Sequence, residues 1–233
     1  MKYAFLIFSI LFYSNLYASN MLKFTGVAYS IEDNQIQYTE EHTQIFNDKN
    51  TILSSSVLYK NPNGEVFAEK KLDFLNGQTT PNMTFNDIRT GTKITLSVEN
   101  DIAALKYISK DDRIDTDINL KGVTVVDAGF DQLLLDEWDS LINGEIVHFQ
   151  FLAPTRGELI NFRVARRSID DEYLYLVLQP DNWLLRVLVD DINLKYSKEN
   201  KQIVEFKGLT NIEEFSAGKD TDKYVTAKIL YKY

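Results

Sequence analysis

Apolar and polar residues alternate with a period of two along most of this chain, which is the pattern of half-buried β-strands. Two neighbouring runs, Thr51–Lys60 and Val66–Phe74, flank the segment Asn61–Glu65. That segment contains a proline followed by Asn-Gly, a combination that favours a tight turn because proline presets φ and glycine accepts a positive φ. The pattern therefore predicts a β-hairpin here.

The same alternation predicts strands along the rest of the chain. They are Met21–Ile31, Gln35–Phe46, Thr92–Glu99, Ala103–Ile108, Ile146–Leu152, Leu159–Ile169, Tyr173–Leu178, Ile192–Tyr196, Gln202–Leu209 and Tyr224–Tyr231. The turn Ser197–Lys201 joins Ile192–Tyr196 and Gln202–Leu209 into a second predicted hairpin. The run Trp183–Val189 fits either a strand or a helix, and its neighbours favour a strand.

One segment, Asp131–Asn143, has the spacing of an amphipathic helix. Its apolar residues recur at intervals of three and four, at Leu134, Leu135, Trp138, Leu141 and Ile142. Gly144 supplies a C-terminal stop. The sequence thus predicts a mainly β (α+β) fold, a large curved antiparallel sheet or half-barrel of about a dozen strands wrapped around one main helix.

The N-terminus has the pattern of a secretory signal peptide. Lys2 precedes the apolar run Tyr3–Phe12, and small residues follow, with the best cleavage position after Ala18. The apolar run is about half of the roughly 20 residues that a membrane span needs, although an uncleaved anchor is the alternative. We therefore expect a signal peptide over residues 1–18 and a single domain over residues 19–233, exported to a bacterial periplasm or secreted.

Composition narrows the classes of partner and chemistry. The chain has no cysteine, which excludes disulfides and a lipid anchor on cysteine. Its formal net charge is −9, which argues against binding to nucleic acid and to anionic lipid head groups. Because no later segment is long and apolar enough to cross a bilayer, we expect no stable membrane insertion.

Candidate catalytic and metal-binding patterns are weak. The two histidines, His42 and His148, lie near no serine or cysteine motif and are too few for a zinc site. The acidic run Asp111–Asp117 lacks the glycine and terminal glutamate of a calcium loop, so we interpret it as a solvated loop. We expect no enzyme activity, metal or cofactor. If the protein were an enzyme, the alternative is a hydrolase that uses two of the 34 acidic residues for catalysis.

Aromatic and basic residues supply the candidate ligand contacts. Phe149, Phe151, Phe162, Tyr173 and Tyr175 lie on successive strands with common parity within each strand, a stripe that fits a plain core or the wall of a cavity. Four arginines fall close together in an otherwise acidic chain, at Arg156, Arg163, Arg166 and Arg167. The proposed ligand-binding residues are Trp138, Phe149, Phe151, Phe162, Arg156 and Arg163.

Several segments carry a resemblance to a family of uncharacterised secreted proteins of Gram-negative bacteria. They are Tyr59–Lys70, Ala128–Asp131 with the Trp138 helix that follows, Phe149–Arg156 and Phe206–Ile212. The resemblance spans most of the expected mature chain and implies no catalytic residue. A looser similarity, in the segments Ile192–Tyr196 and Ile203–Ile212, is to the periplasmic lipoprotein-carrier fold, a half-barrel closed by helices around an apolar cavity. That fold uses several helices, whereas this sequence predicts one.

Two functional hypotheses follow. The leading one is a non-enzymatic periplasmic binding protein that holds an apolar or lipid-like ligand inside the curved sheet. The alternative is an envelope protein-interaction module with no small ligand, which would use the strand edges that an open sheet leaves available for pairing.

Overall fold

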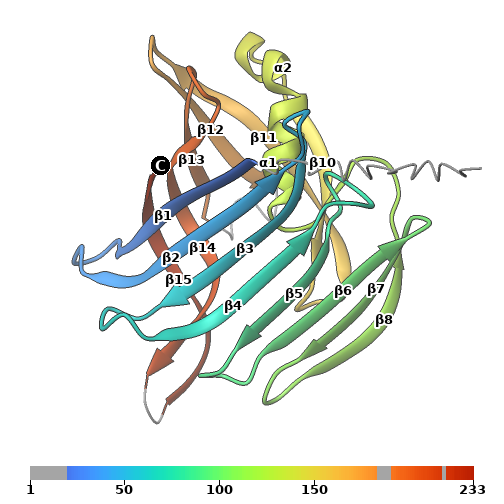
Figure 1. Cartoon of the computed structure of the whole chain (residues 1–233), viewed down its shortest axis with the longest axis vertical. Helices are drawn as coiled ribbons and strands as arrows, with labels where there is room; N and C mark the ends of the chain where they lie inside the picture. The colour runs from blue at the N-terminus through green and yellow to red at the C-terminus, as the bar shows by residue number, and fades with distance from the viewer. Residues whose placement is uncertain (1–19, 183–189, 217–218) are drawn as a thin grey trace, which may run out of the picture.

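The computed structural model describes residues 20–182, 190–216 and 219–233. Within these residues, fifteen strands form one sheet, and two short helices lie at one end of it (Figure 1). The strands before the helices are β1 (Asn20–Ser30), β2 (Ile36–Phe46), β3 (Ile52–Lys60), β4 (Val66–Asp73), β5 (Asn82–Asp87), β6 (Lys93–Glu99), β7 (Ile102–Ile108), β8 (Arg113–Asn119) and β9 (Thr124–Val125). Those after the helices are β10 (Val147–Ala153), β11 (Glu158–Ile169), β12 (Tyr173–Pro180), β13 (Ile192–Ser197), β14 (Ile203–Ser216) and β15 (Lys219–Lys232).

The sheet is an antiparallel meander whose first and last strands pair with each other. Its order is β8-β7-β6-β5-β4-β3-β2-β1-β15-β14-β13-β12-β11-β10-β9, and among the described strands only β9 pairs in parallel, with β10. The two end strands, β8 and β9, follow one another in the chain, so the sheet curls until its two ends lie close together. Figure 1 shows this curled, barrel-like shape. The mainly β architecture is confirmed, with fifteen strands where about a dozen were expected.

The hairpin predicted around Asn61–Glu65 is confirmed as β3–β4. The amide of Asn61 donates to the carbonyl oxygen of Glu65 at 3.0 Å, and Gly64 has a φ of 87°, which favours glycine. The predicted hairpin around Ser197–Lys201 is confirmed as β13–β14. The signal peptide and the run Trp183–Val189 lie outside the described residues.

The acidic run Asp111–Asp117 was wrongly interpreted as a loop, because most of it belongs to the strand β8. Ile114, Thr116 and Ile118 are half-buried on one face of β8. Asp115 and Asp117 lie on the other face, which is exposed to solvent. An edge strand with one solvated face tolerates this charge, and the charge discourages pairing with another chain. The strands β5 and β9 were also missed.

The predicted single helix is two short helices, α1 (Gly129–Asp136) and α2 (Trp138–Asn143). The break lies at Glu137, which has φ −97° and ψ 15°, a sparsely allowed conformation outside the helical region. Both segments still bury apolar side chains in one cluster, because the break keeps Trp138 on the side of Leu134. The predicted stop at Gly144 is confirmed, with a φ of 88°.

The interior is divided among three apolar clusters. One joins α1 and α2 to β10–β13, a second joins β1–β5 to β14 and β15, and a third joins β3–β8 to Val126 and Leu152. The helices therefore pack against one wall of the curved sheet and leave the opposite wall to face them across the interior. None of the described helices is both long enough and apolar enough to cross a membrane.

Candidate ligand cavity

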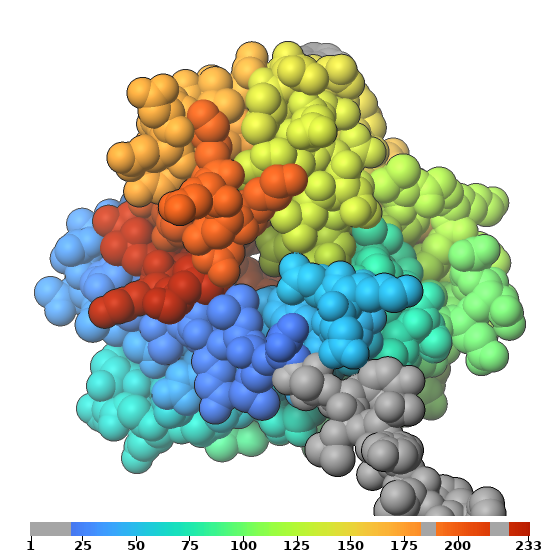
Figure 2. All heavy atoms as spheres, turned by 45° about the horizontal axis from the view of Figure 1, so that its top comes forward, coloured from blue at the N-terminus to red at the C-terminus, as the bar shows by residue number. Residues whose placement is uncertain are grey.

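Two cavities occupy the interior between the walls of the sheet. The first, beside α1, has a volume of about 290 Å³, and the second, beside β5 and β6, has a volume of about 260 Å³. Both are lined by Lys70, Asp127, Phe151, Leu209, Thr210 and Asn211, so they adjoin one another. Figure 2 shows the surface hollowed between the yellow-green helices, the orange and red strands β13–β15 and the blue strands β1–β3, which also line the first cavity.

Most residues that line the two cavities are apolar. In the first they include Phe24, Val57, Leu72, Phe130, Leu194 and Ile229, and in the second Met83, Phe85, Ile94 and Leu152. Ligand sites in proteins are mostly apolar clefts of about 300–1,000 Å³ that carry a few placed polar groups. Each cavity lies near the lower end of that range.

The turn between β9 and α1 brings two carboxylates to the cavity wall. Asp127 has a φ of 44°, a left-handed conformation that aspartate tolerates better than most residues. Val126 donates its amide to the carbonyl oxygen of Thr79 at 2.9 Å, and a Cβ at Gly129 would lie 2.0 Å from the same oxygen. Glycine is therefore required at 129, and the close approach fixes the position of Asp127 and of Asp131 in the first turn of α1.

Asp127 forms an ion pair with Lys70 of β4 between the two cavities. The Lys70 Nζ and Asp127 Oδ1 atoms are 2.7 Å apart, and the two side chains are only 11% and 17% exposed. Burial by itself lowers the pKa of Lys70, but the adjacent Asp127 and the Tyr59 hydroxyl outweigh it, so the pKa lies above its usual range. Lys70 is therefore a fixed cation inside the barrel.

Asp131 makes a different contact on the other side of the first cavity. The Tyr196 hydroxyl donates a hydrogen bond to Asp131 Oδ1 at 2.6 Å. Burial raises the pKa of Asp131, and the hydrogen bond from Tyr196 offsets part of that rise. Asp131 thus accepts a hydrogen bond from a neutral hydroxyl, whereas Asp127 forms an ion pair with a cation.

A third polar contact joins aromatic rings at the same cavity. His42 Nε2 lies 2.8 Å from Glu40 Oε2, and the His42 ring stacks on Phe24 with 4.3 Å between centroids. The ring of Tyr231 meets His42 edge-on at 5.8 Å. A Cβ at Gly26 would lie 2.9 Å from the Tyr231 ring and 3.0 Å from the Glu40 carboxylate, so the absence of a side chain at Gly26 makes room for both.

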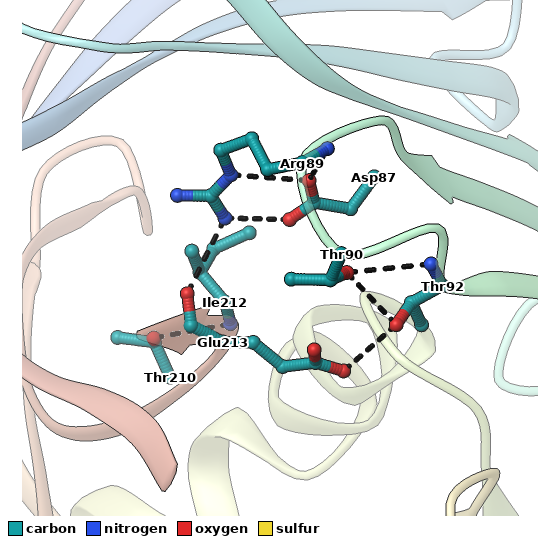
Figure 3. A network of polar contacts seen from close by, with 7 residues as sticks. All are labelled: Asp87, Arg89, Thr90, Thr92, Thr210, Ile212 and Glu213. Atoms are coloured by element: carbon teal, nitrogen blue, oxygen red, sulfur yellow. Dashed lines mark hydrogen bonds and ion pairs between the residues drawn. The ribbon is translucent and has the colours of Figure 1, made fainter. Parts of the chain in front are cut away.

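A polar network closes the far end of the second cavity (Figure 3). Arg89 binds both oxygens of buried Asp87, with contacts of 3.0 and 2.5 Å, and donates to the carbonyl oxygen of Glu213 at 3.3 Å. Thr92 donates its hydroxyl to Glu213 Oε1 at 2.9 Å. These contacts tie the β5–β6 turn to the irregular part of β14 and hold buried Ile212 against the core.

The predicted ligand-binding aromatics all lie on the inner side of the sheet or on α2. Phe151 lines both cavities. Phe149 and Trp138 are buried in the apolar cluster beside the first cavity, and Phe162 packs between Phe149 and Phe151 with 6.2 Å from each ring. Of these four, Phe151 contributes directly to the cavity wall.

The predicted basic residues lie elsewhere. Arg156 is exposed and pairs with Glu158 at 2.7 Å, and Arg163 pairs across the sheet with His148 and donates to Gln179 at 2.9 Å. Neither arginine lines either cavity. Tyr173 is also on the outer face with Tyr175, where the Lys195 ammonium lies over its ring at 3.6 Å.

Sequence reasoning missed the charged residues of the cavity, although one signal was present. Lys70 stands at an inward-facing position of β4 between Ala68 and Leu72, and Glu40 stands likewise between Tyr38 and His42. A charge at an apolar parity indicates an interior polar site. In the described part of the chain, no group of three or more metal-ligating side chains is suited to a metal ion.

Comparisons with known proteins give one structural neighbour and no sequence relative. No protein-family model and no curated protein matches the chain. A crystal structure of a beta-barrel-like protein of domain of unknown function DUF1849 from Brucella abortus matches 92% of this chain and 96% of its own, with a TM-score of 0.41 and 10% identity. The resemblance to a family of secreted proteins that the sequence indicates stays a prediction.

Proposed function

We propose that this protein is a non-enzymatic binding protein of the bacterial periplasm that holds an apolar or lipid-like ligand inside its curved sheet. The observation that carries the proposal is the pair of adjoining cavities, about 290 and 260 Å³, whose walls are mostly apolar. Well-packed interiors contain few voids larger than a water molecule, so space of this size is unusual in a domain that only needs to fold. The signal-peptide pattern of the sequence supports the compartment.

The size of the cavities indicates the size of the ligand. Each lies near the lower end of the range of about 300–1,000 Å³ that small-molecule sites occupy. A ligand with one hydrocarbon chain suits this space better than a lipid with two chains. Phe151, which lines both cavities, would contact such a chain where the cavities adjoin.

Native mass spectrometry tests the proposal. The protein is purified gently from the periplasm and its mass is measured before and after organic extraction. We expect a stoichiometric adduct that extraction releases as an apolar compound. A bare mass that stays unchanged after incubation with envelope lipids would overturn the proposal.

A blocking variant connects any adduct to the cavity. Thr210 lines both cavities and is half-buried on the inner side of β14, so Thr210→Trp narrows the space. Leu230 is 39% exposed on the neighbouring strand β15 and lines neither cavity, which makes Leu230→Trp the matched control. We expect the first variant to lose the adduct and the second to retain it.

An envelope protein-interaction module is the second candidate, and the edge strand β8 favours it. In the described residues, β8 pairs with β7 on one side and with no strand on the other. The carboxylates of Asp115 and Asp117 discourage pairing with an acidic or neutral chain, so this edge would accept a basic strand from a partner protein. Crosslinking in intact cells from a photoreactive residue placed at Asp117 tests this: capture of one defined protein supports it, and capture of none contradicts it.

A further inference from the structure

The first cavity is lined by more carboxylates than cations. The carboxylates of Glu40, Asp127 and Asp131 line it, whereas the possible cations among its lining residues are Lys70 and His42. Lys70 contacts Asp127 at 2.7 Å, and His42 contacts Glu40 at 2.8 Å. Asp131 accepts a hydrogen bond from the neutral Tyr196 hydroxyl and forms no ion pair with another described residue, so its carboxylate brings a negative charge that no described cation pairs with.

Aromatic rings lie beside these carboxylates. Phe24 stacks on His42 at 4.3 Å and on Tyr233 at 4.6 Å, and it meets Tyr231 edge-on at 6.1 Å. Of these rings, Phe24, His42 and Tyr231 line the cavity itself. Ring faces attract cations, and aromatic rings beside carboxylates are a common way to bind an ammonium group. Because His42 and Tyr233 stack on the two faces of Phe24, Phe24 holds these rings in place, and Tyr231 is the lining ring that we expect to meet a cation.

Aliphatic side chains form much of the rest of the cavity wall. Val57, Leu72, Leu194 and Ile229 contribute aliphatic side chains from four different strands. Some of these side chains lie directly beside the charged ones, since Val57 pairs with His42 of β2 and Ile229 lies beside Glu40. The wall continues with further apolar side chains, such as Met83, Phe85 and Ile94, in the adjoining second cavity. A ligand that matches both the charged and the apolar side chains is an amphiphile with a small charged head and one chain.

We infer that the first cavity binds a single-chain amphiphile with a positively charged amine head, with the head against Asp131 and Glu40 and the chain among the aliphatic residues. This inference rests on the proposed function and adds the sign of the ligand's charge to it. A carboxylate head of the same size would meet the Asp131 and Glu40 carboxylates with like charge, and Lys70 is already bound to Asp127. An uncharged head would leave the negative charge of Asp131 unbalanced.

Calorimetric titration with three ligands of one chain length tests the inference. The purified protein is titrated at neutral pH with dodecylamine and dodecanoate below their micellar concentrations and with dodecanol below its solubility limit. We expect the amine to bind at least about tenfold more tightly than the alcohol, which corresponds to about 1.4 kcal/mol, and the carboxylate to bind more weakly than the alcohol. Alcohol or carboxylate binding as tight as that of the amine would overturn the inference and leave the proposed function standing.

Two variants and one control locate the charge. Asp131→Asn keeps the acceptor for Tyr196 and removes the charge, so we expect amine affinity to fall about tenfold and the preference over the alcohol to shrink. Glu40→Gln is the second variant and decides the question if the first does not fold. Asp136 is exposed on the same helix and does not line the first cavity, so Asp136→Asn should leave the preference unchanged. An unchanged preference in both variants would contradict the assignment, and failure of all three ligands to bind would overturn the proposed function together with it.

Discussion

The ion pair between Lys70 and Asp127 offers a sharp test of how the interior is held. Removing one partner of a buried pair leaves an uncompensated charge and typically costs about 3–5 kcal/mol. Because both side chains touch the cavity and are 11% and 17% exposed, we expect the lower end of that range, about 3 kcal/mol, for Asp127→Asn. Asparagine tolerates the positive φ of position 127, so the substitution changes charge without straining the backbone.

Urea denaturation measures this effect. With a slope of about 2–3 kcal/mol per molar urea, a loss of about 3 kcal/mol lowers the midpoint by roughly 1–1.5 M. The pKa of Lys70 should also fall in the variant, because burial lowers it and Asp127 no longer opposes that effect. The double variant Lys70→Met with Asp127→Asn should regain much of the loss, since no buried charge remains unpaired.

An exposed pair on the same strand is the control. Lys71 and Glu69 lie 2.8 Å apart with side chains 62% and 44% exposed, so Lys71→Met should cost no more than about 1 kcal/mol. If Asp127→Asn proved as mild as Lys71→Met, the interior pair would be solvated like a surface pair. Lys70 would then not be a fixed internal cation.

Four further predictions concern other contacts of the interior. Gly26→Ala should destabilise the fold by about 1–3 kcal/mol, since its Cβ meets neighbouring side chains at 2.9–3.0 Å, and thermal unfolding would show this as a lowered midpoint. Because the pKa of Asp131 is raised above 3.8, the folded state holds the proton more tightly, so the stability that this group contributes is present at low pH and is lost as pH rises above about 4. Asp131→Asn should therefore flatten the decline in stability between about pH 4 and neutrality, and a decline as steep as in the parent would contradict the assignment. Tyr196→Phe removes the hydrogen bond that lowers the Asp131 pKa, so carboxyl titration followed by NMR should show that pKa rise further, with a loss of stability of about 1–3 kcal/mol. Arg89→Met leaves buried Asp87 without its cation and should cost about 3–5 kcal/mol in urea denaturation, whereas an effect under about 1 kcal/mol would show that the network in Figure 3 is not needed for folding.

Local signals sufficed for most of the sheet. The Asn-Gly turn and the strict alternation of β3 and β4 predicted that hairpin from the sequence, and the stop at Gly144 was also correct. The edge strand β8 was missed because its run of charged residues was taken as the mark of a loop. The alternating positions of Ile114 and Ile118, which indicate a strand, were given less weight. The helix was predicted as continuous because a break at Glu137 leaves the apolar spacing intact.

The cavity could be predicted only in part, because its polar residues come from distant segments. Asp127 lies in a turn beside β9, and it meets Lys70 only after the sheet has curled. The alternation of β10 correctly placed Phe151 on the inner face of the sheet. Arg163 was predicted to bind the ligand, but it alternates with buried Val164 and therefore lies on the outer face. Parity thus predicts which face a residue occupies, but it does not predict which distant residues share that face.

The cost of the interior charges bears on what the cavity is for. Buried ion pairs are often no more stabilising than apolar residues of the same volume, so a barrel needing only stability would gain nothing from Lys70 and Asp127 in its core. Asp131 adds a carboxyl whose raised pKa records a further desolvation cost. These groups line open space instead of filling it. Charges retained at a cavity wall, at a cost to the fold, fit a site whose polar groups are completed by a ligand better than they fit a packed core.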